Sequence, residues 1–461
     1  MARMAICRCR AVTPSRSISQ SPDEKAGVMA ICQETLNVWE KRAPLAPHHV
    51  EQLIQNGIKV IVQPSERRAY NDTAYSQMGA EVQEDISEAS LVIGVKQVPI
   101  DHLLPNKTYA FFSQIAKGQL SNISLLNAVL KKNIRLIDYR RMVDSEGTPV
   151  LGFGKYAGAA GMINILHVIG LRLLALGHYT PFLHIAPCHS YSNFEVARQA
   201  VRVAGSKISL GQMPNPIGPI TFIFTGTGAV LQGAQEILQE LPLEYSHPQC
   251  LPTFLENGAL NKLHACVLQK QDLYKHKNGG NFDNKEFLSH PERYAGTFSK
   301  IAPYASCVVN GLPWTPSSSR LISIRDAKAL LQPRTLLPPG SSRLPHRLLA
   351  ICDLSDDPEG SIEFAKECTA VDSPFCLYDP EEDTYKHSFR ERGVMLCSID
   401  MMSAQIARNA TDCFGSLLLP YIRDMFRSSA MTPFEDYDAG PIVKNAVITS
   451  NGKLTFNFKY T

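Results

Sequence analysis

The chain has 461 residues, of which 44% are hydrophobic and 19% charged, with 46 basic and 43 acidic side chains. The length suits two large α/β domains or three smaller ones, and the hydrophobic share is typical of a globular protein. The balanced charge, without a dense Lys/Arg block, argues against nucleic-acid binding. No uncharged apolar run approaches the roughly 20 residues that cross a bilayer, so we expect no membrane partner.

The cysteines predict reduced thiols in an intracellular protein. There are 12 of them, and they are spread along the chain without a CxxC pair. This spacing does not favour a zinc or redox site, and we expect no bound metal.

The first 22 residues have the composition of a mitochondrial transit peptide. They contain four arginines and five serines or threonines, and the first acid is Asp23. An Arg-rich, Ser-rich and acid-poor segment is typical of such peptides, with a disordered basic tail as the alternative. We therefore predict a mitochondrial location and leave residues 1–22 out of the fold.

Residues 23–153 alternate short apolar strands with amphipathic helices. Strands are predicted at 28–32, 58–62, 91–95, 109–112 and 134–137, and helices at 47–56 and 121–133. This alternation predicts a parallel sheet covered by helices on both faces. We expect this first domain to bind the substrate.

A glycine- and alanine-rich stretch, 152–161, opens a long apolar helix through Leu176, and we place the domain junction near Phe153. The second domain, 154–402, has predicted strands at 220–225, 348–352 and 394–398, and loop composition at 211–219 and 317–340. A helix at about 403–427 is expected to return to the first domain, and the polar tail 428–461 to be peripheral. The predicted fold class is α/β, with two doubly wound, Rossmann-like parallel sheets flanking a cleft.

The strand at 220–225 runs into Gly226-Thr-Gly228 and then into a helical pattern, the context of a dinucleotide-binding turn. Gly226 permits the tight turn, and Gly228 lets a pyrophosphate approach the helix amino terminus. The third glycine is displaced, because Leu231 takes its usual place and Gly233 comes later. The alternative to a dinucleotide-binding turn is a glycine turn with a purely structural role.

The predicted cofactor-binding residues lie at this turn and at later strand ends. They are Gly226, Thr227, Gly228, Ala229, Val230, Glu244, Cys352, Asp353 and Asp400. Glu244 is predicted to bind a ribose diol, while Ser246 and His247 tolerate a 2′-phosphate. The pattern therefore does not separate NAD(H) from NADP(H).

Other candidate residues follow strands of the first domain. Arg42, in a loop before a helix, could hold a substrate carboxylate bidentately, with a surface ion pair as the alternative. Lys96 ends the strand at 91–95, where partial burial suits a general base, with a snorkelling lysine as the alternative. Three further polar residues follow the strand at 109–112, namely Gln114, Lys117 and Gln119.

Eight segments together resemble a known family. They are Glu40–Pro47, Gly94–Lys96, Phe153–Gly158, Gly161–His167, Phe224–Gly228, Ile351–Ser355, Gly360–Phe364 and Cys397–Asp400. They resemble the lysine-ketoglutarate reductase half of the animal α-aminoadipic semialdehyde synthases, over about residues 28–452. More distantly, the chain is similar to fungal lysine-forming saccharopine dehydrogenases and to the alanine dehydrogenase/transhydrogenase fold.

The resemblance implies a reductive condensation in lysine degradation. The ε-amine of lysine adds to the carbonyl of 2-oxoglutarate, water is lost, and NADPH reduces the imine to saccharopine. Such chemistry needs carboxylate-binding groups and groups that exchange protons. By resemblance, Lys96 is catalytic, Arg42, Lys117 and Gln119 bind substrate, and Asp400 lies beside the nicotinamide.

Three positions depart from the family pattern. Gln114 stands where the relatives have a catalytic histidine, and a glutamine cannot carry a proton near neutral pH. Arg140 replaces a glutamate beside the catalytic lysine, and Pro149 replaces a substrate-side arginine. The alternative hypothesis is therefore a relative that binds dinucleotide or amino acid without turnover. A different amino-acid dehydrogenase is a third reading, and the oligomeric state, including a homo-oligomer, stays open.

Overall fold

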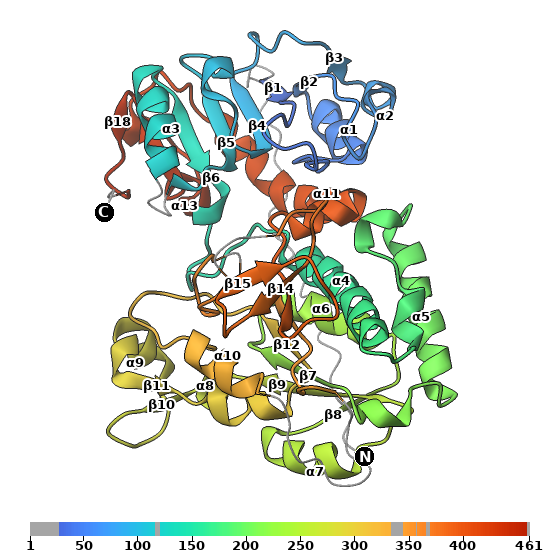
Figure 1. Cartoon of the computed structure of the whole chain (residues 1–461). Coiled ribbons are helices and arrows are strands. Elements are labelled where there is room, and N and C mark those ends of the chain that lie inside the picture. Colours follow the sequence, from blue (N-terminus) through green and yellow to red (C-terminus); the bar gives the residue numbers. More distant parts are fainter. Residues whose placement is uncertain (1–26, 116–119, 333–343, 356, 366–368, 459–461) are drawn as a thin grey trace, which may run out of the picture.

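The protein contains two eight-stranded, mostly parallel sheets and one two-stranded hairpin. The structure, a computed structural model, describes residues 27–115, 120–332, 344–355, 357–365 and 369–458. Figure 1 shows the first sheet at the top of the view and the second below it, with helix α11 (Ala407–Leu418) between them. The predicted fold class is confirmed, and the predicted transit peptide lies outside the described residues.

The first sheet has the strand order β18-β17-β6-β5-β4-β1-β2-β3. Its strands are β1 (Val28–Ile31), β2 (Lys59–Val62), β3 (Glu81–Val82), β4 (Leu91–Lys96), β5 (Thr108–Phe112), β6 (Arg135–Asp138), β17 (Val447–Ser450) and β18 (Lys453–Leu454). Its helices are α1 (Pro47–Gln55), α2 (Asp72–Gln77), α3 (Leu120–Lys131) and α13 (Pro441–Lys444). Met29 and Ile31 pack into one core while Ala30 packs into another, so both faces are covered, as continuous apolar strands require.

The carboxyl-terminal segment is part of this sheet, so the prediction of a peripheral tail is wrong. β17 pairs antiparallel with β6, with Val447 opposite Ile137, and Val447 and Ile448 are fully buried. The polar composition of residues 428–461 hides this short apolar strand. It covers the edge that β6 would otherwise expose.

The second sheet has the order β15-β14-β16-β13-β12-β7-β9-β8. Its strands are β7 (Thr221–Thr225), β8 (Leu243–Tyr245), β9 (Leu263–Leu268), β12 (Cys307–Asn310), β13 (Ala350–Asp353), β14 (Cys376–Asp379), β15 (Thr384–Lys386) and β16 (Val394–Cys397). Its helices are α4 (Gly154–Ala175), α5 (Phe194–Ser209), α6 (Ala229–Leu238), α7 (Leu251–Asn257), α8 (Lys270–Leu273), α9 (Asn284–Ser289) and α10 (Ile324–Leu330). The hairpin pairs β10 (Tyr274–His276) with β11 (Tyr294–Gly296). α10 lies inside the predicted loop 317–340, where Ser323 caps its first turn.

Helix α4 packs directly against α6. A Cβ on Gly158 would lie 1.7 Å from the Val230 carbonyl oxygen, and one on Gly233 would lie 1.9 Å from the Lys155 carbonyl oxygen. Only glycine lets the two backbones come this close. In the described part of the chain, α4 is the one helix long and apolar enough to span a membrane, but 78% of its most apolar window is buried inside the protein.

The predicted returning helix consists of several pieces. A 3-10 helix, η11 (Met402–Ile406), precedes α11, and Pro420 lies in the short turn before α12 (Ile422–Phe426). Phe414 and Leu418 bury their side chains in the core of the first sheet. The chain thus returns to the first sheet after β16, and we propose the domain division after Phe153 on this basis.

Candidate active site

Four neighbouring parallel strands of the first sheet end at one edge, and each is followed by a polar side chain. Glu34 follows β1, Lys96 ends β4, Gln114 follows β5, and Arg140 lies in the 3-10 helix η3 (Tyr139–Arg141) after β6. Because these strands are adjacent in the order β6-β5-β4-β1, the topology brings all four to the same edge. The carboxyl edge of an open α/β sheet is where ligands bind.

Glu34 fixes the end of the strand that carries Lys96. The peptide N–H of Val95 donates to Glu34 Oε1 at 2.5 Å, and that of Lys96 donates to Oε2 at 3.1 Å. The pairing of β4 with β5 shifts register between Ile93 and Lys96, which frees these N–H groups for the carboxylate. The direction in which Lys96 leaves the sheet therefore depends on Glu34.

The carboxyl group of Glu34 is also electrostatically unusual. Burial, followed by the repulsion of Glu40, raises the pKa of Glu34 to about 8, although the two backbone donors and Arg42 act in the opposite direction. Sequence reasoning missed this residue. An acid shortly after an apolar strand was the available signal.

Lys96 meets Asp400 across the two sheets. Lys96 Nζ lies 3.7 Å from Asp400 Oδ1, and Asp400 follows β16 of the second sheet. The Lys96 side chain is 23% exposed and that of Asp400 is 51% exposed. The structure thus brings together two residues that the sequence predicted separately, at a place that solvent reaches.

Arg42 is buried in a polar contact rather than lying on the surface. Its Nε donates to Glu40 Oε1 at 2.8 Å, its Nη2 donates to Glu40 Oε2 at 2.5 Å, and its Nη1 donates to Ser403 Oγ at 2.7 Å. The guanidinium also lies 4.2 Å from the centre of the Phe153 ring. Burial alone would lower the pKa of Arg42, but the Glu40 carboxylate raises it.

Only part of the donor capacity of Arg42 is used by these contacts. Arginine has five N–H donors. Three of them are engaged with Glu40 and Ser403, and the other two have no side-chain partner among the described residues.

Gln114 is held in an unusual backbone conformation with an unsatisfied acceptor. Its φ is 59°, in the left-handed region that non-glycine residues rarely adopt. Gln114 Oε1 is buried without a hydrogen-bond partner in the described ranges, and the same is true of Gln97 Oε1 next to Lys96. Two amide oxygens that follow neighbouring strands of the first sheet thus have acceptor capacity that no described residue uses.

The other first-domain candidates are either exposed to solvent or not described. Arg140 and Pro149 are exposed, and Pro149 bridges Val143 at the base of a turn. Lys117 and Gln119 fall outside the described residues.

The glycine turn of the second sheet lies open to solvent. Gly226 has a φ of 119°, and Gly228 precedes the first residue of α6 without a side-chain cap. A Cβ on Gly228 would meet no atom within 4 Å, and Thr227, Gly228 and Ala229 are exposed. The first N–H groups of α6 are thus accessible to an anion, and the turn fits the pyrophosphate of a dinucleotide.

The start of helix α4 lies close both to this turn and to Arg42. A Cβ on Gly154 would lie 3.1 Å from Val230 Cγ2 and 3.6 Å from Ala229 Cβ, so the start of α4 lies against the start of α6. The residue before Gly154 is Phe153, whose ring lies beneath the Arg42 guanidinium. The turn and the Arg42 contact therefore flank the same helix end.

Glu244 does not reach the glycine turn, which corrects its prediction as a ribose ligand. In the sheet, Glu244 of β8 lies opposite His264 of β9, and His264 lies opposite Thr221 of β7. Thr221 is four residues before the end of β7. At about 3.3 Å per residue, this places Glu244 roughly 13 Å short of the turn along the strand direction. Its carboxylate pairs instead with Lys262 Nζ at 2.6 Å.

The two predicted residues at the end of β13 are buried. Cys352 lies in the hydrophobic core, so its side chain is not a cofactor ligand. Asp353 is 3% exposed and accepts from Asn310 Nδ2 at 2.9 Å and from Ser355 Oγ at 2.7 Å. Burial raises the pKa of Asp353 against these hydrogen bonds. Asp353 therefore stabilises the ends of β12 and β13 through hydrogen bonds beneath the protein surface.

A cavity of about 210 Å³ lies beside the returning helix. It is lined by residues of both parts of the chain, among them Trp39, Lys41, His189, Phe194, Gln405 and Arg408. The described residues contain no group of three or more His, Cys, Asp or Glu side chains that could hold a metal ion.

The fold of this chain, with two mostly parallel sheets, is similar to that of alanine dehydrogenases. Residues 30–160 match the family model "Alanine dehydrogenase/PNT, N-terminal domain". The structure is similar to that of an L-alanine dehydrogenase, with a TM-score of 0.52 and 14% sequence identity over 93% of this chain and 96% of the other. At 14% sequence identity, this similarity shows a shared fold and nothing more specific.

Sequence comparison is more specific. The chain is 48% identical over 99% of its length to "Alpha-aminoadipic semialdehyde synthase, mitochondrial" of Rattus norvegicus, covering 49% of the rat protein. It is 21% identical over 83% of its length to "Saccharopine dehydrogenase [NAD(+), L-lysine-forming]" of Emericella nidulans, covering 88% of that protein. The chain is therefore a homologue of the α-aminoadipic semialdehyde synthases, and it spans about half the length of the animal synthases it matches. The predicted resemblance is confirmed.

Proposed function

We propose that this chain is a reductase that condenses L-lysine with 2-oxoglutarate and reduces the resulting imine with NADPH to saccharopine. The near-full-length homology to the synthases supports the reaction class. The single observation that carries the proposal is the pairing of Lys96 with Asp400 across the two sheets, at 3.7 Å. The basic first 22 residues and the name of the rat relative support a mitochondrial location.

The reaction sets clear demands on the site. The lysine ε-nitrogen must lose a proton before it bonds to the carbonyl carbon, and the carbonyl oxygen must gain protons to leave as water. A reduced dinucleotide whose pyrophosphate is held at the glycine turn would supply the hydride that the imine carbon needs, and the nitrogen must keep or gain a proton. The protein must therefore hold carboxylates, hold an ammonium and exchange protons.

The residues at the strand edge match these demands. Lys96 is solvent-accessible and held by its backbone, which suits a group that exchanges protons with the substrate amine. The two spare donors of Arg42 suit a substrate carboxylate. The amide oxygen of Gln114 suits the N–H of an amine, which a histidine would deprotonate instead.

A second candidate function is binding of dinucleotide or amino acid without turnover. The observation that favours it is Gln114, because an amide stands at the position of the family's acid–base histidine. General acid–base groups contribute about 100- to 10,000-fold to rate, so the loss of one brings turnover close to background.

One assay separates the two functions. Purified protein is mixed with lysine, 2-oxoglutarate and NADPH, and the absorbance of reduced cofactor is followed, with cofactor affinity measured in parallel. The reductase predicts oxidation that depends on both substrates and that Gln114→His accelerates. Cofactor binding without oxidation, in the wild type and in Gln114→His alike, would establish the non-catalytic function.

A further inference from the structure

The strand beside the glycine turn is β9, although β8 is the strand that follows α6 along the chain. β7 pairs with β9 in parallel, with Thr225 opposite Leu268, and β8 lies beyond β9 at the sheet edge. The peptide N–H of Gly226 donates to the Leu268 carbonyl oxygen at 2.8 Å. The residues that leave β9, Gln269 and Lys270, therefore come next to the turn.

This position discriminates between the two nicotinamide dinucleotides. With the pyrophosphate on the glycine turn, the adenosine ribose lies over the end of the neighbouring strand. An acid there binds the two hydroxyls of NAD, whereas a cation accommodates the 2′-phosphate of NADP. Here the strand is followed by a neutral amide, Gln269, and by a cation, Lys270.

The nearby acid, Asp272, is hydrogen-bonded to the backbone. Its Oδ2 accepts from the peptide N–H of Gln269 at 2.8 Å, which caps the short helix α8. The carboxylate is thus folded back onto the backbone. It does not offer NAD the acidic partner that its hydroxyls require.

Lys270 has no anionic partner among the described residues. Its Nζ lies 3.4 Å from Asn284 Oδ1 and 5.6 Å from the centre of the Phe287 ring, and it forms no ion pair with any residue that the structure describes. An ammonium beside a neutral amide and an aromatic ring remains available to a phosphate.

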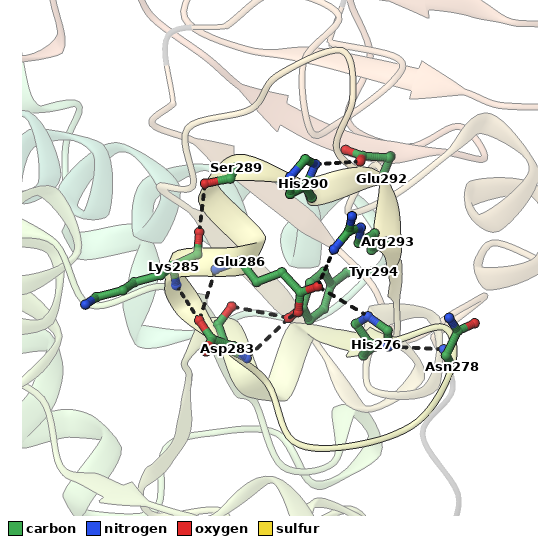
Figure 2. A network of polar contacts seen from close by, with 10 residues as sticks. All are labelled: His276, Asn278, Asp283, Lys285, Glu286, Ser289, His290, Glu292, Arg293 and Tyr294. Atoms are coloured by element: carbon green, nitrogen blue, oxygen red, sulfur yellow. Dashed lines mark hydrogen bonds and ion pairs between the residues drawn. The ribbon is translucent and has the colours of Figure 1, made fainter.

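Helix α9, which carries Asn284 and Phe287, is part of a network of polar contacts (Figure 2). Asp283 accepts from the N–H groups of Lys285 and Glu286 and so caps α9. Glu286 pairs with Arg293 Nη1 at 2.8 Å and accepts from the Tyr294 hydroxyl at 2.9 Å. Figure 2 shows the Glu286 carboxylate directed at these partners, which neutralise it inside the network.

We propose that Lys270 binds the 2′-phosphate of NADP(H) and makes this chain select NADP(H) over NAD(H). The inference rests on the proposed function insofar as a dinucleotide must occupy the glycine turn. It does not depend on turnover or on the identity of the amino-acid substrate.

The test is the affinity of the whole chain for NADPH and NADH, measured by the fluorescence of the reduced nicotinamide. A hydrogen bond to a charged group contributes about 1.5–3 kcal/mol, so Lys270→Ala should weaken NADPH binding by roughly 10- to 100-fold and leave NADH binding within about twofold. Gln269→Asp should weaken NADPH and strengthen NADH. Lys262→Ala, at the other end of β9 and paired with Glu244, is the matched control and should change neither affinity.

Each outcome decides the inference. Equal affinities of the wild type for NADPH and NADH, or unchanged NADPH binding in Lys270→Ala, would overturn it. Equal losses for both cofactors would show that Lys270 contacts the shared part of the dinucleotide. Lys270-dependent NADPH binding without any oxidation by lysine and 2-oxoglutarate would uphold the inference and refute the proposed reductase.

Discussion

Two glycines of the second domain, only five residues apart, should respond to alanine in opposite ways. At Gly233, a Cβ would lie 1.9 Å from the carbonyl oxygen of Lys155, and rigid backbone on both helices cannot yield easily. At Gly228, a Cβ meets nothing within 4 Å, and its φ of −68° and ψ of 172° suit alanine. One glycine serves helix packing, whereas the other leaves room for a ligand.

The expected magnitudes follow from these distances. Overpacking against rigid backbone costs about 3 kcal/mol, at the upper end of the usual range, so Gly233→Ala should lower the midpoint of thermal unfolding by roughly 6–12 °C. Gly228→Ala should cost about 0.5–1 kcal/mol through the weaker helix cap, a shift of at most a few degrees. It should nevertheless weaken NADPH binding by at least about tenfold, because the new methyl group stands where the pyrophosphate would lie.

Calorimetry and cofactor titration on the same protein samples check both expectations. Full NADPH affinity in Gly228→Ala would refute the placement of the pyrophosphate at this turn. An unchanged unfolding midpoint in Gly233→Ala would refute the close approach of α4 and α6.

Three further variants test other parts of the molecule. Lys96→Met should abolish oxidation of NADPH while the affinity for the cofactor stays within about twofold of wild type. Residual activity above about one hundredth of wild type would show that Lys96 is not the proton-exchanging group. The pKa of Glu34 is raised to about 8, so the folded chain keeps a proton that the unfolded chain releases above about pH 4.3. The free energy of unfolding should therefore fall between pH 5 and 8, by at most about 1.4 kcal/mol per pH unit. Urea unfolding of Glu34→Gln should lack this slope, and parallel pH profiles of the two proteins would contradict the assignment. Ile448→Ala, in the buried strand β17, should cost about 2–5 kcal/mol in the same measurement, whereas a peripheral tail predicts no change.

The first sheet could be predicted from sequence because its signals are local. Each apolar run that reads as a strand, such as 58–62 or 91–95, is a buried strand within one or two residues of the expected bounds. The glycine turn was found for the same reason, since strand, turn and helix are contiguous.

The errors of the sequence prediction have one cause: strands that pair in a sheet are not consecutive in the chain. Glu244 was expected at the turn because the strand after α6 usually lies beside the strand before it. Here β9 takes that place and moves β8 to the edge. Similarly, β17 pairs with a strand far earlier in the chain. Spacing along the sequence carries no information about either pairing.

The three departures from the family pattern do not weigh equally on catalysis. Arg140 and Pro149 are exposed. Solvent therefore screens the charge of Arg140, and its electrostatic effect on a ligand at Lys96 is small. Gln114, by contrast, has a buried amide oxygen and a left-handed backbone, on the strand next to the one that carries Lys96. The chemical consequence of the departures is therefore concentrated in Gln114. For this reason Gln114→His, and not Arg140→Glu, should restore the larger part of any missing turnover, and a greater gain from Arg140→Glu would refute this ranking.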